Sequence, residues 1–153
     1  EDYDLWLRMA HAGYQFGKVA DILLRWRDTP GRTSRQDGRY SPEAFMRCKA
    51  HYISRGPLRD DKEVIVWGAG QMGGKFGRLL EEQGKHVRAF VDIDPKKIGN
   101  RRLNGWVISP DDLPPPGEVQ VLACVGSRGA RDLIRAELTK RGYVEGESFW
   151  GVL

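Results

Sequence analysis

The pattern of apolar and polar residues changes character at residues 54–62, where glycine, proline and mixed charges come together. Such a stretch between two regions of regular apolar spacing is typical of a linker. Beyond it, short apolar runs alternate with segments of helical spacing, which predicts a parallel sheet covered by helices. We therefore predict a first part, residues 1–56, a linker at residues 57–61, and a second part, residues 62–153.

The second part shows strand and helix patterns in turn. Short apolar runs predict its strands, and helical spacing closed by glycine predicts its helices. The predicted strands are residues 64–67, 87–91, 106–108, 119–125 and 149–153, and the predicted helices are residues 72–83 and 129–141. Because crossovers between parallel strands are right-handed, these elements predict an α/β fold with a small, open, doubly wound, Rossmann-like sheet.

The first part is predicted to be mainly helical. Residues 3–12 place apolar side chains on one helical stripe, residues 14–19 and 22–26 resemble short strands, and the polar residues 27–40 are typical of a loop. A second helix is expected from Ser41, which would be its N-cap with proline directly after it. The residues expected on the inward face of this helix are Ala44, Phe45, Cys48 and Tyr52.

Composition favours a soluble cytoplasmic protein. The sequence is 40% apolar and 30% charged, and no apolar run approaches the roughly 20 residues of a membrane span. Cys48 and Cys124 lack metal-ligand or CxxC spacing, which fits structural cysteines in a reducing compartment. The net charge of +4 comes from basic residues interleaved with acids, so no nucleic-acid partner is predicted. The chain begins at Glu1 without a leader, and we expect it to be a piece of a longer protein.

The strongest local motif is the segment 68–73, GAGQMG, which we call the glycine turn because it follows a predicted strand and opens a predicted helix. Glycine there permits a tight turn, close approach of a phosphate, and close packing of helix on strand. Asp92, at the end of the next strand, is placed to accept from ribose hydroxyls. Gly68, Gly70, Gly73 and Asp92 are therefore candidate residues for a nucleotide or sugar nucleotide, and the alternative is a purely structural turn.

Two further motifs have the residue types of a phosphate site and of a metal site. The segment Gly126-Ser127-Arg128-Gly129 also joins a strand to a helix, so Ser127 and Arg128 are candidate phosphate contacts, with an ordinary solvated turn as the alternative. The DxD pattern at residues 92–94 could suit a metal, but its place after a strand already explains Asp92, and we predict no metal site. An NAD(P)-dependent oxidoreductase is a weak alternative, because no residue marks hydride transfer.

The first residues of the chain, EDYDLWLR, resemble the ED-x-D-LW-x-R stretch of family 2 glycosyltransferases, which are inverting enzymes of the GT-A fold. Residues 13–27 are similar to the strands that follow this stretch in the family, and residues 30–35 are similar to its active-site loop. The segments VIVWGAG, AFVDIDPKKIG, NGWVISP and VGSRGAR resemble the Rossmann-like domain appended to some of these enzymes. The resemblance implies the carboxy-terminal part of a bacterial glycosyltransferase, with residues 1–56 ending its catalytic domain.

The resemblance also implies roles for particular residues. Asp2, with Glu1 beside it, would be the general base that deprotonates the acceptor hydroxyl. Arg32 and Arg35 would contact the diphosphate of the donor. The complete enzyme, peripheral to the inner membrane, would use Mg²⁺ or Mn²⁺ to transfer a sugar from a nucleotide-sugar donor to a glycan or glycoconjugate acceptor in polysaccharide biosynthesis. Without the upstream donor-binding strands, this chain is expected to be inactive alone.

Two rival interpretations belong to other classes. Residues 62–153 could form a non-catalytic module that binds a nucleotide or sugar nucleotide and regulates something else. They could also form a scaffold for protein contacts, which exposure of Trp106 or Trp150 beside other apolar residues would favour. The sequence leaves the donor, the acceptor and the oligomeric state open.

Overall fold

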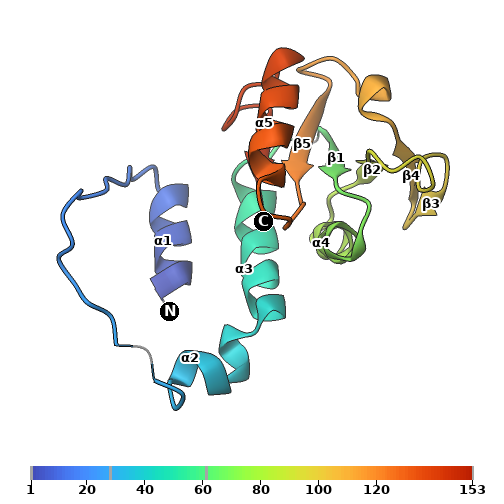
Figure 1. Cartoon of the computed structure of the whole chain (residues 1–153). Helices are drawn as coiled ribbons and strands as arrows, with labels where there is room; N and C mark the ends of the chain where they lie inside the picture. Colours follow the sequence, from blue (N-terminus) through green and yellow to red (C-terminus); the bar gives the residue numbers. More distant parts are fainter. Residues whose placement is uncertain (1, 28, 61, 153) are drawn as a thin grey trace.

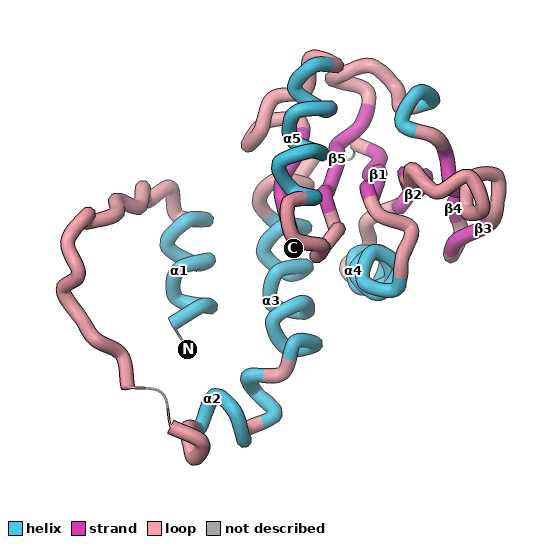
Figure 2. The backbone as a smooth tube through the Cα atoms, in the orientation of Figure 1, coloured by secondary structure: helices cyan, strands magenta, loops and turns pink. Residues whose placement is uncertain are grey.

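The computed structural model describes residues 2–27, 29–60 and 62–152 (Figures 1 and 2). Its helices are α1 (Asp2–His11), α2 (Thr33–Gln36), α3 (Pro42–Arg55), α4 (Gln71–Glu82) and α5 (Ala130–Lys140), with short 3₁₀ turns η1 (Gly38–Tyr40) and η2 (Pro110–Asp112). Its strands are β1 (Glu63–Trp67), β2 (Val87–Val91), β3 (Arg101–Arg102), β4 (Gly105–Ile108), β5 (Val119–Ala123) and β6 (Phe149–Gly151). The elements predicted after residue 62 are confirmed to within a few residues, and β3 was not predicted.

The strands form one sheet in the order β3-β4-β2-β1-β5-β6. All neighbouring pairs are parallel except β3 with β4. From β1 the chain first builds outward to β2 and β4, then returns to add β5 and β6 on the other side of β1. This reversal of direction is the mark of a doubly wound sheet, so the predicted Rossmann-like α/β fold is confirmed.

Alternate side chains of β1 point to the two faces of the sheet, and each face has its own core. On one face Val64 and Val66 pack in a cluster with Phe76 of α4 and with Met46 and Ala50 of α3. Burial of a side chain such as that of Phe76, which is fully enclosed, stabilises the fold by about 1.5–3 kcal/mol. The helix before the predicted linker therefore shares a core with the sheet, and the division of the chain into two domains stays a prediction.

In the described part of the chain, one α-helix covers the opposite face. Ile65 and Trp67 of β1 pack there against Ile134 and Leu138 of α5. Residues 92–118, which run from the end of β2 to the start of β5, contain η2 but no α-helix (Figure 2). The carboxyl ends of β1 and β2 are consequently left partly uncovered on this face.

Helix α3 begins as predicted but turns a different side to the core. The Ser41 side chain accepts a hydrogen bond from the N–H of Ala44 at 3.2 Å, and proline occupies the first turn. The deepest positions are Met46, Ala50 and Ser54, not the predicted stripe. Ala44, Phe45, Cys48 and Tyr52 are half-buried. Helix α3 packs against the sheet and α4 on one side and against α1 on another. The predicted apolar stripe lies toward α1, which is the smaller of these contacts.

The contact between α1 and α3 combines an aromatic pair with a hydrogen bond. The rings of Tyr3 and Phe45 meet edge to face with centroids 5.1 Å apart. The Tyr52 hydroxyl donates to Asp4 at 2.8 Å, and Asp4 also pairs with Arg8 one turn further along α1 at 3.0 Å. These contacts hold α1 on the side of α3 that does not face the sheet.

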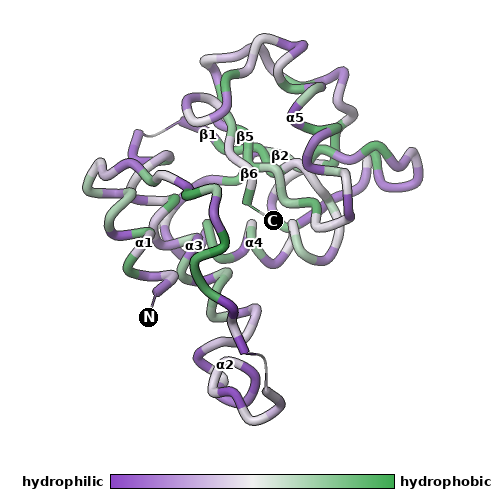
Figure 3. Tube along the Cα trace, turned by 60° about the vertical axis from the view of Figure 1, so that its left-hand side comes forward, coloured by the Kyte–Doolittle hydropathy of each residue, from purple (hydrophilic) through white to green (hydrophobic). Residues whose placement is uncertain are grey.

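The two strands predicted between α1 and α2 do not form. Residues 14–26 contain no strand, and much of this hydrophobic segment is exposed, with Ile22 at 87% and Leu23 and Leu24 at 77% (Figure 3). A strand needs a neighbour to pair its N–H and C=O groups, and apolar spacing along the sequence does not supply one. The predicted loop at residues 27–40 differs as well, because its second half holds α2 and η1. No helix in the described parts of the chain is both long and apolar enough to cross a membrane.

The connection between α5 and β6 offers a direct test of the packing. Tyr143 is buried, and its hydroxyl donates to the carbonyl of Pro114 at 2.5 Å. Burial, followed by the nearby charge of Glu118, raises the Tyr143 pKa to about 12. Replacing Tyr143 with phenylalanine should lower the free energy of unfolding at pH 7 by about 1–2 kcal/mol, because that carbonyl loses its partner.

The same substitution should change the alkaline pH dependence of stability. A phenol whose pKa is raised by folding contributes stability below its unfolded pKa of about 10, and that contribution is lost as the pH rises toward about 12. Urea unfolding of the unaltered protein and of the Tyr143→Phe variant at pH 7, 9 and 11 should show the difference shrinking at the highest pH. A constant difference would contradict the assigned burial of the phenol.

Candidate functional site

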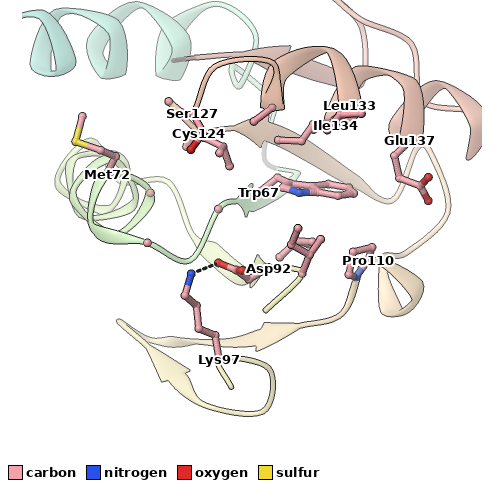
Figure 4. Close-up of a pocket in the computed structure, with 18 of the residues that line it drawn as sticks. Trp67, Met72, Asp92, Lys97, Pro110, Cys124, Ser127, Leu133, Ile134 and Glu137 are labelled. Carbon is pink, nitrogen blue, oxygen red and sulfur yellow. Dashed lines mark hydrogen bonds and ion pairs between the residues drawn. The ribbon is translucent and has the colours of Figure 1, made fainter. Parts of the chain in front are cut away.

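A cleft of about 720 Å³ opens at the carboxyl ends of β1, β2 and β5, where the sheet changes direction (Figure 4). This is where ligands bind in open α/β sheets. The cleft is lined by the glycine turn, by residues after β2, β4 and β5, and by one side of α5. Its lining residues are Trp67, Gly68, Gly70, Gln71, Met72, Gly73, Val91, Asp92, Ile93, Lys97, Pro110, Asp111, Cys124, Val125, Gly126, Ser127, Ala130, Leu133, Ile134, Glu137 and Arg141.

Two glycines of the glycine turn are required by the fold itself. Gly68 has φ +122°, and a Cβ there would lie 2.9 Å from the carbonyl oxygen of Cys124. A Cβ on Gly73 would overlap the carbonyl oxygen of Gly68 and lie 2.9 Å from its carbonyl carbon. Gly68 lets the turn lie close against the chain that follows β5, and Gly73 brings α4 close against the end of β1, so both are explained without any ligand.

Gly70 is different, because nothing in the folded chain requires it. Its φ is −74°, which any residue adopts, and a Cβ at this position would meet no atom within 4 Å. Gly70 is the N-cap of α4, where no side chain caps the helix, and it lines the cleft. The first N–H groups of α4 have no partner within the helix, and the residues that carry them line the cleft at the positive end of the helix dipole.

Asp92 ties the end of β2 to the glycine turn. Its Oδ2 accepts from the N–H of Ala69 at 3.1 Å and from Lys97 Nζ at 2.8 Å, and its Oδ1 accepts from the N–H of Asp94 at 3.0 Å. The carboxylate is 11% exposed and points toward the cleft (Figure 4). Oδ2 already accepts two hydrogen bonds, whereas Oδ1 accepts one and keeps capacity for a further donor such as a ribose hydroxyl.

The surroundings of Asp92 keep it charged. Burial raises the pKa of Asp92, but the hydrogen bonds from Lys97, Asp94 and Ala69 and the Lys97 charge lower it by more, so the net pKa lies below the usual value. The hydrogen bond to Asp92 and its charge raise the pKa of Lys97. The site therefore holds a carboxylate and an ammonium as a pair at neutral pH.

The part of the cleft away from the glycine turn is apolar. Trp67 lies at its floor, 4% exposed, between Pro110 on one side and Leu133 and Ile134 of α5 on the other (Figure 4). At the far end Arg141 closes the space, because it donates to Glu137 and to Asp111, each at 2.7 Å. A flat apolar group bound here would lie over the indole ring, with polar groups only at its edge.

The second predicted turn contributes in part. Ser127 lines the cleft, at the end of β5 and opposite the glycine turn. Arg128 is exposed and does not line it. Gly129, at φ +79°, is the N-cap of α5, again without a side-chain cap. The structure therefore brings together Gly68, Gly70, Gly73, Asp92 and Ser127, and the role of each as a binding residue stays a prediction.

The residues predicted from the glycosyltransferase resemblance do not line the cleft. Asp2 is exposed in the first turn of α1, and Glu1 lies outside the described residues. The guanidinium of Arg32 stacks on Trp26 at 3.8 Å from the ring centroid, and Arg35 is in α2. Within the described residues no group of three or more His, Cys, Asp or Glu side chains is arranged to hold a metal ion.

Sequence reasoning missed several residues of the site. Trp67 was assigned only to a strand, and no role was predicted for Lys97 or Arg102. For Lys97 a signal existed, since a basic residue five positions after Asp92 can fold back on it within a turn. Trp67 and Arg141 become neighbours of the cleft only through packing of α5 on the sheet.

Comparison with known proteins shows the fold. No protein-family model and no curated protein matches the chain. The crystal structure of RSP, a Rex-family repressor, has a TM-score of 0.52 at 17% identity over 67% of this chain and 50% of that chain. The structure of RSP in complex with beta-NADH has a TM-score of 0.49 at 20% identity over 67% of this chain and 51% of that chain. The chain thus spans about half the length of these proteins, and at such identity the first likeness shows the fold alone.

The identification as a family 2 glycosyltransferase fragment is wrong. Neither a family model nor a curated protein of that class matches, and a solved structure that resembles the chain is that of a Rex-family repressor. Local contacts explain the opening motif: two acids lie in the first turn of α1, where the helix dipole favours them, and Asp4 pairs with Arg8. The roles of Glu1, Asp2, Arg32 and Arg35 came only from that resemblance, and no contact described above tests them.

Proposed function

We propose that the chain is a nucleotide-binding module whose cleft holds the phosphates of a nucleotide at the glycine turn and its ribose at Asp92. The observation that carries the proposal is Gly70. The fold explains Gly68 and Gly73, whereas Gly70 lines the cleft with an ordinary φ and an empty Cβ position, as close approach of a phosphate to the backbone requires.

The chemistry of the cleft fits the three parts of a nucleotide. The unpaired N–H groups at the start of α4 suit phosphate oxygens. The Asp92 carboxylate, held ionised by its hydrogen bonds, keeps capacity on Oδ1 to accept from a ribose hydroxyl. The apolar space over Trp67 suits a base, which has a flat face and polar edges. These supports lie in one continuous cleft and in the order phosphate, ribose, base.

The proposal is for binding without chemistry. The charged groups that line the cleft, Asp92, Lys97, Asp111, Glu137 and Arg141, are all engaged in ion pairs with one another. An oxidoreductase would need a group free to move a proton beside the transferred hydride. The sequence predicted no nucleic-acid partner. The likeness to a protein named a repressor does not support that prediction, which stays untested.

The scaffold interpretation has less support. Trp106 is 52% exposed, but the guanidinium of Arg101 lies 4.9 Å from its ring centroid. Trp150 is half-buried against the core.

Calorimetric titration with ADP, UDP, a UDP-sugar, NADH and NADPH tests the proposal. At least one should bind with a Kd near or below 100 μM, about 5.5 kcal/mol of binding. Gly70→Ala should weaken that binding at least tenfold while the urea midpoint stays unchanged, because the methyl group meets only the ligand.

Gly38→Ala is the matched control for this experiment. Gly38 also has an ordinary φ and an empty Cβ position, but it lies in η1 and does not line the cleft. Its substitution should leave both affinity and stability unchanged. If no nucleotide binds, or if the Gly70 and Gly38 variants bind equally well, the proposal is wrong.

A further inference from the structure

Arg102 reaches the glycine turn from an unexpected direction. It ends β3, at the edge of the sheet, where it pairs with Gly105 of β4. Its side chain crosses the first turn of α4, and Nη2 donates to the carbonyl of Gly70 at 3.0 Å. That carbonyl also accepts the first hydrogen bond of the helix, from the N–H of Gly74 at 3.0 Å. Gly70 is therefore held from behind by two donors.

Helix α4 is shaped to seat this guanidinium. A Cβ on Gly74 would lie 2.6 Å from both Cζ and Nε of Arg102. The φ of Gly74 is not in the left-handed region, so its backbone does not require glycine. Glycine inside a helix costs about 0.5–1 kcal/mol relative to alanine. Glycine at position 74 is explained by the space that the Arg102 guanidinium occupies, which a Cβ would fill.

The position of this cation is unfavourable without an anion. The start of α4 is the positive end of the helix dipole, where a cation is repelled. No ion pair of Arg102 occurs within the described residues, and its buried Nε has no hydrogen-bond partner. Lys97 is a second cation near Arg102. The Arg102 charge lowers the pKa of Lys97, although the hydrogen bond to Asp92 and its charge raise that pKa overall. Because Asp92 already pairs with Lys97, the Arg102 charge is the one that a negatively charged group at the glycine turn would offset.

We infer that Arg102 is a positioning residue that makes the glycine turn selective for a diphosphate, an inference that rests on the proposed nucleotide site. The peptide between Gly70 and Gln71 is trans, so its carbonyl and its N–H point in opposite directions. By fixing the carbonyl, Arg102 fixes the Gln71 N–H toward the cleft. Its hydrogen bond also polarises the peptide, and its charge adds to the attraction for phosphate oxygens.

The test compares ligands with and without phosphates. Calorimetry measures ADP and adenosine, with UDP and uridine as the second pair, against the unaltered protein and Arg102→Met. Methionine keeps an unbranched stem of similar length and removes the charge and the donors. The diphosphates should bind at least tenfold more weakly to the variant, whereas the nucleosides should bind equally to both proteins. The dependence of diphosphate affinity on salt should also become shallower, because one cation has left the site.

Two further variants separate positioning from folding. Arg102→Lys keeps a cation that can still reach the Gly70 carbonyl and should recover much of the lost diphosphate affinity. Gly74→Ala leaves Arg102 in the sequence but fills its seat, and alanine favours the helix. This variant should unfold at the same or a higher temperature and still lose diphosphate affinity. It keeps the inference testable even if Arg102→Met proves unstable.

The results separate a role of Arg102 in binding from a role in the fold alone. Equal losses for diphosphate and nucleoside, or full diphosphate affinity in Gly74→Ala, would show that Arg102 serves only the fold and would overturn the inference. If the unaltered protein binds none of the four compounds but does bind NADH or NADPH, the same comparison is made with that ligand and its nucleoside. If nothing binds, the proposed function itself is wrong, and the role of Arg102 is wrong with it.

Discussion

Replacing Gly73 with alanine is expected to lower the free energy of unfolding by about 4 kcal/mol or more, enough to unfold a marginally stable domain. The added methyl group would overlap the carbonyl oxygen of Gly68, and both atoms belong to backbone that is fixed by β1 and α4. A flexible side chain could move aside, but here the whole helix would have to shift from the sheet. The change would open the core that Phe76 and Val66 share.

Thermal unfolding followed by circular dichroism measures this effect. Gly70→Ala is the matched control, because it makes the same chemical change three residues away with no atom within 4 Å of the new carbon. Its melting temperature should match that of the unaltered protein. A Gly73→Ala protein that melts within a few degrees of the control would show that α4 is not packed against the glycine turn as described.

Replacing Asp92 with asparagine is expected to reduce nucleotide affinity by about thirtyfold or more, because at least one charge-assisted hydrogen bond to the ribose, worth about 1.5–3 kcal/mol, is lost along with the carboxylate charge. The amide must also turn its NH2 group either toward the Asp94 N–H or toward the Ala69 N–H and Lys97, all of which need an acceptor. Titration with the tightest ligand found for the unaltered protein measures the loss. Asp60→Asn, an exposed carboxylate remote from the cleft, should bind as the unaltered protein does.

The Asp92 substitution should also alter the acid side of the stability profile. A carboxyl whose pKa is lowered by folding contributes stability above its unfolded pKa of about 3.9, and this contribution is lost as the pH falls through the folded value. The difference in unfolding free energy between the unaltered protein and Asp92→Asn should therefore be largest near neutral pH and shrink below pH 4. A difference that grows in acid would contradict the assigned ionisation of Asp92.

The short sequence motifs differed in whether residues close by in the chain were enough to interpret them. The glycine turn could be interpreted from sequence because its glycines, the strand before it and the helix after it are consecutive in the chain. The opening motif could not, since EDYDLWLR satisfies a helix start and an Asp4–Arg8 pair as well as it satisfies a resemblance. A resemblance over eight residues supports a family assignment only when the strands and helices around it also match that family.

The segment between α1 and α2 shows the same limit in a different form. Residues 14–26 have the apolar content of strands, but no described strand pairs with them, and Trp26 finds its contact with Arg32 instead. Apolar spacing records which side chains avoid water. It does not record whether another backbone lies alongside to pair the N–H and C=O groups.

The sequence by itself determined the alternation of strands and helices after residue 62, the doubly wound sheet, the N-cap at Ser41, and the placing of Gly70 and Asp92 at neighbouring strand ends. These features depend on periodicity and on residues close together in the chain. Only the tertiary structure decided that α3 shares the core of the sheet, that Trp67 and α5 wall the cleft, and that Arg102 lies behind the glycine turn. Those contacts join residues far apart in sequence, and they follow from which surfaces must be buried together when the sheet closes.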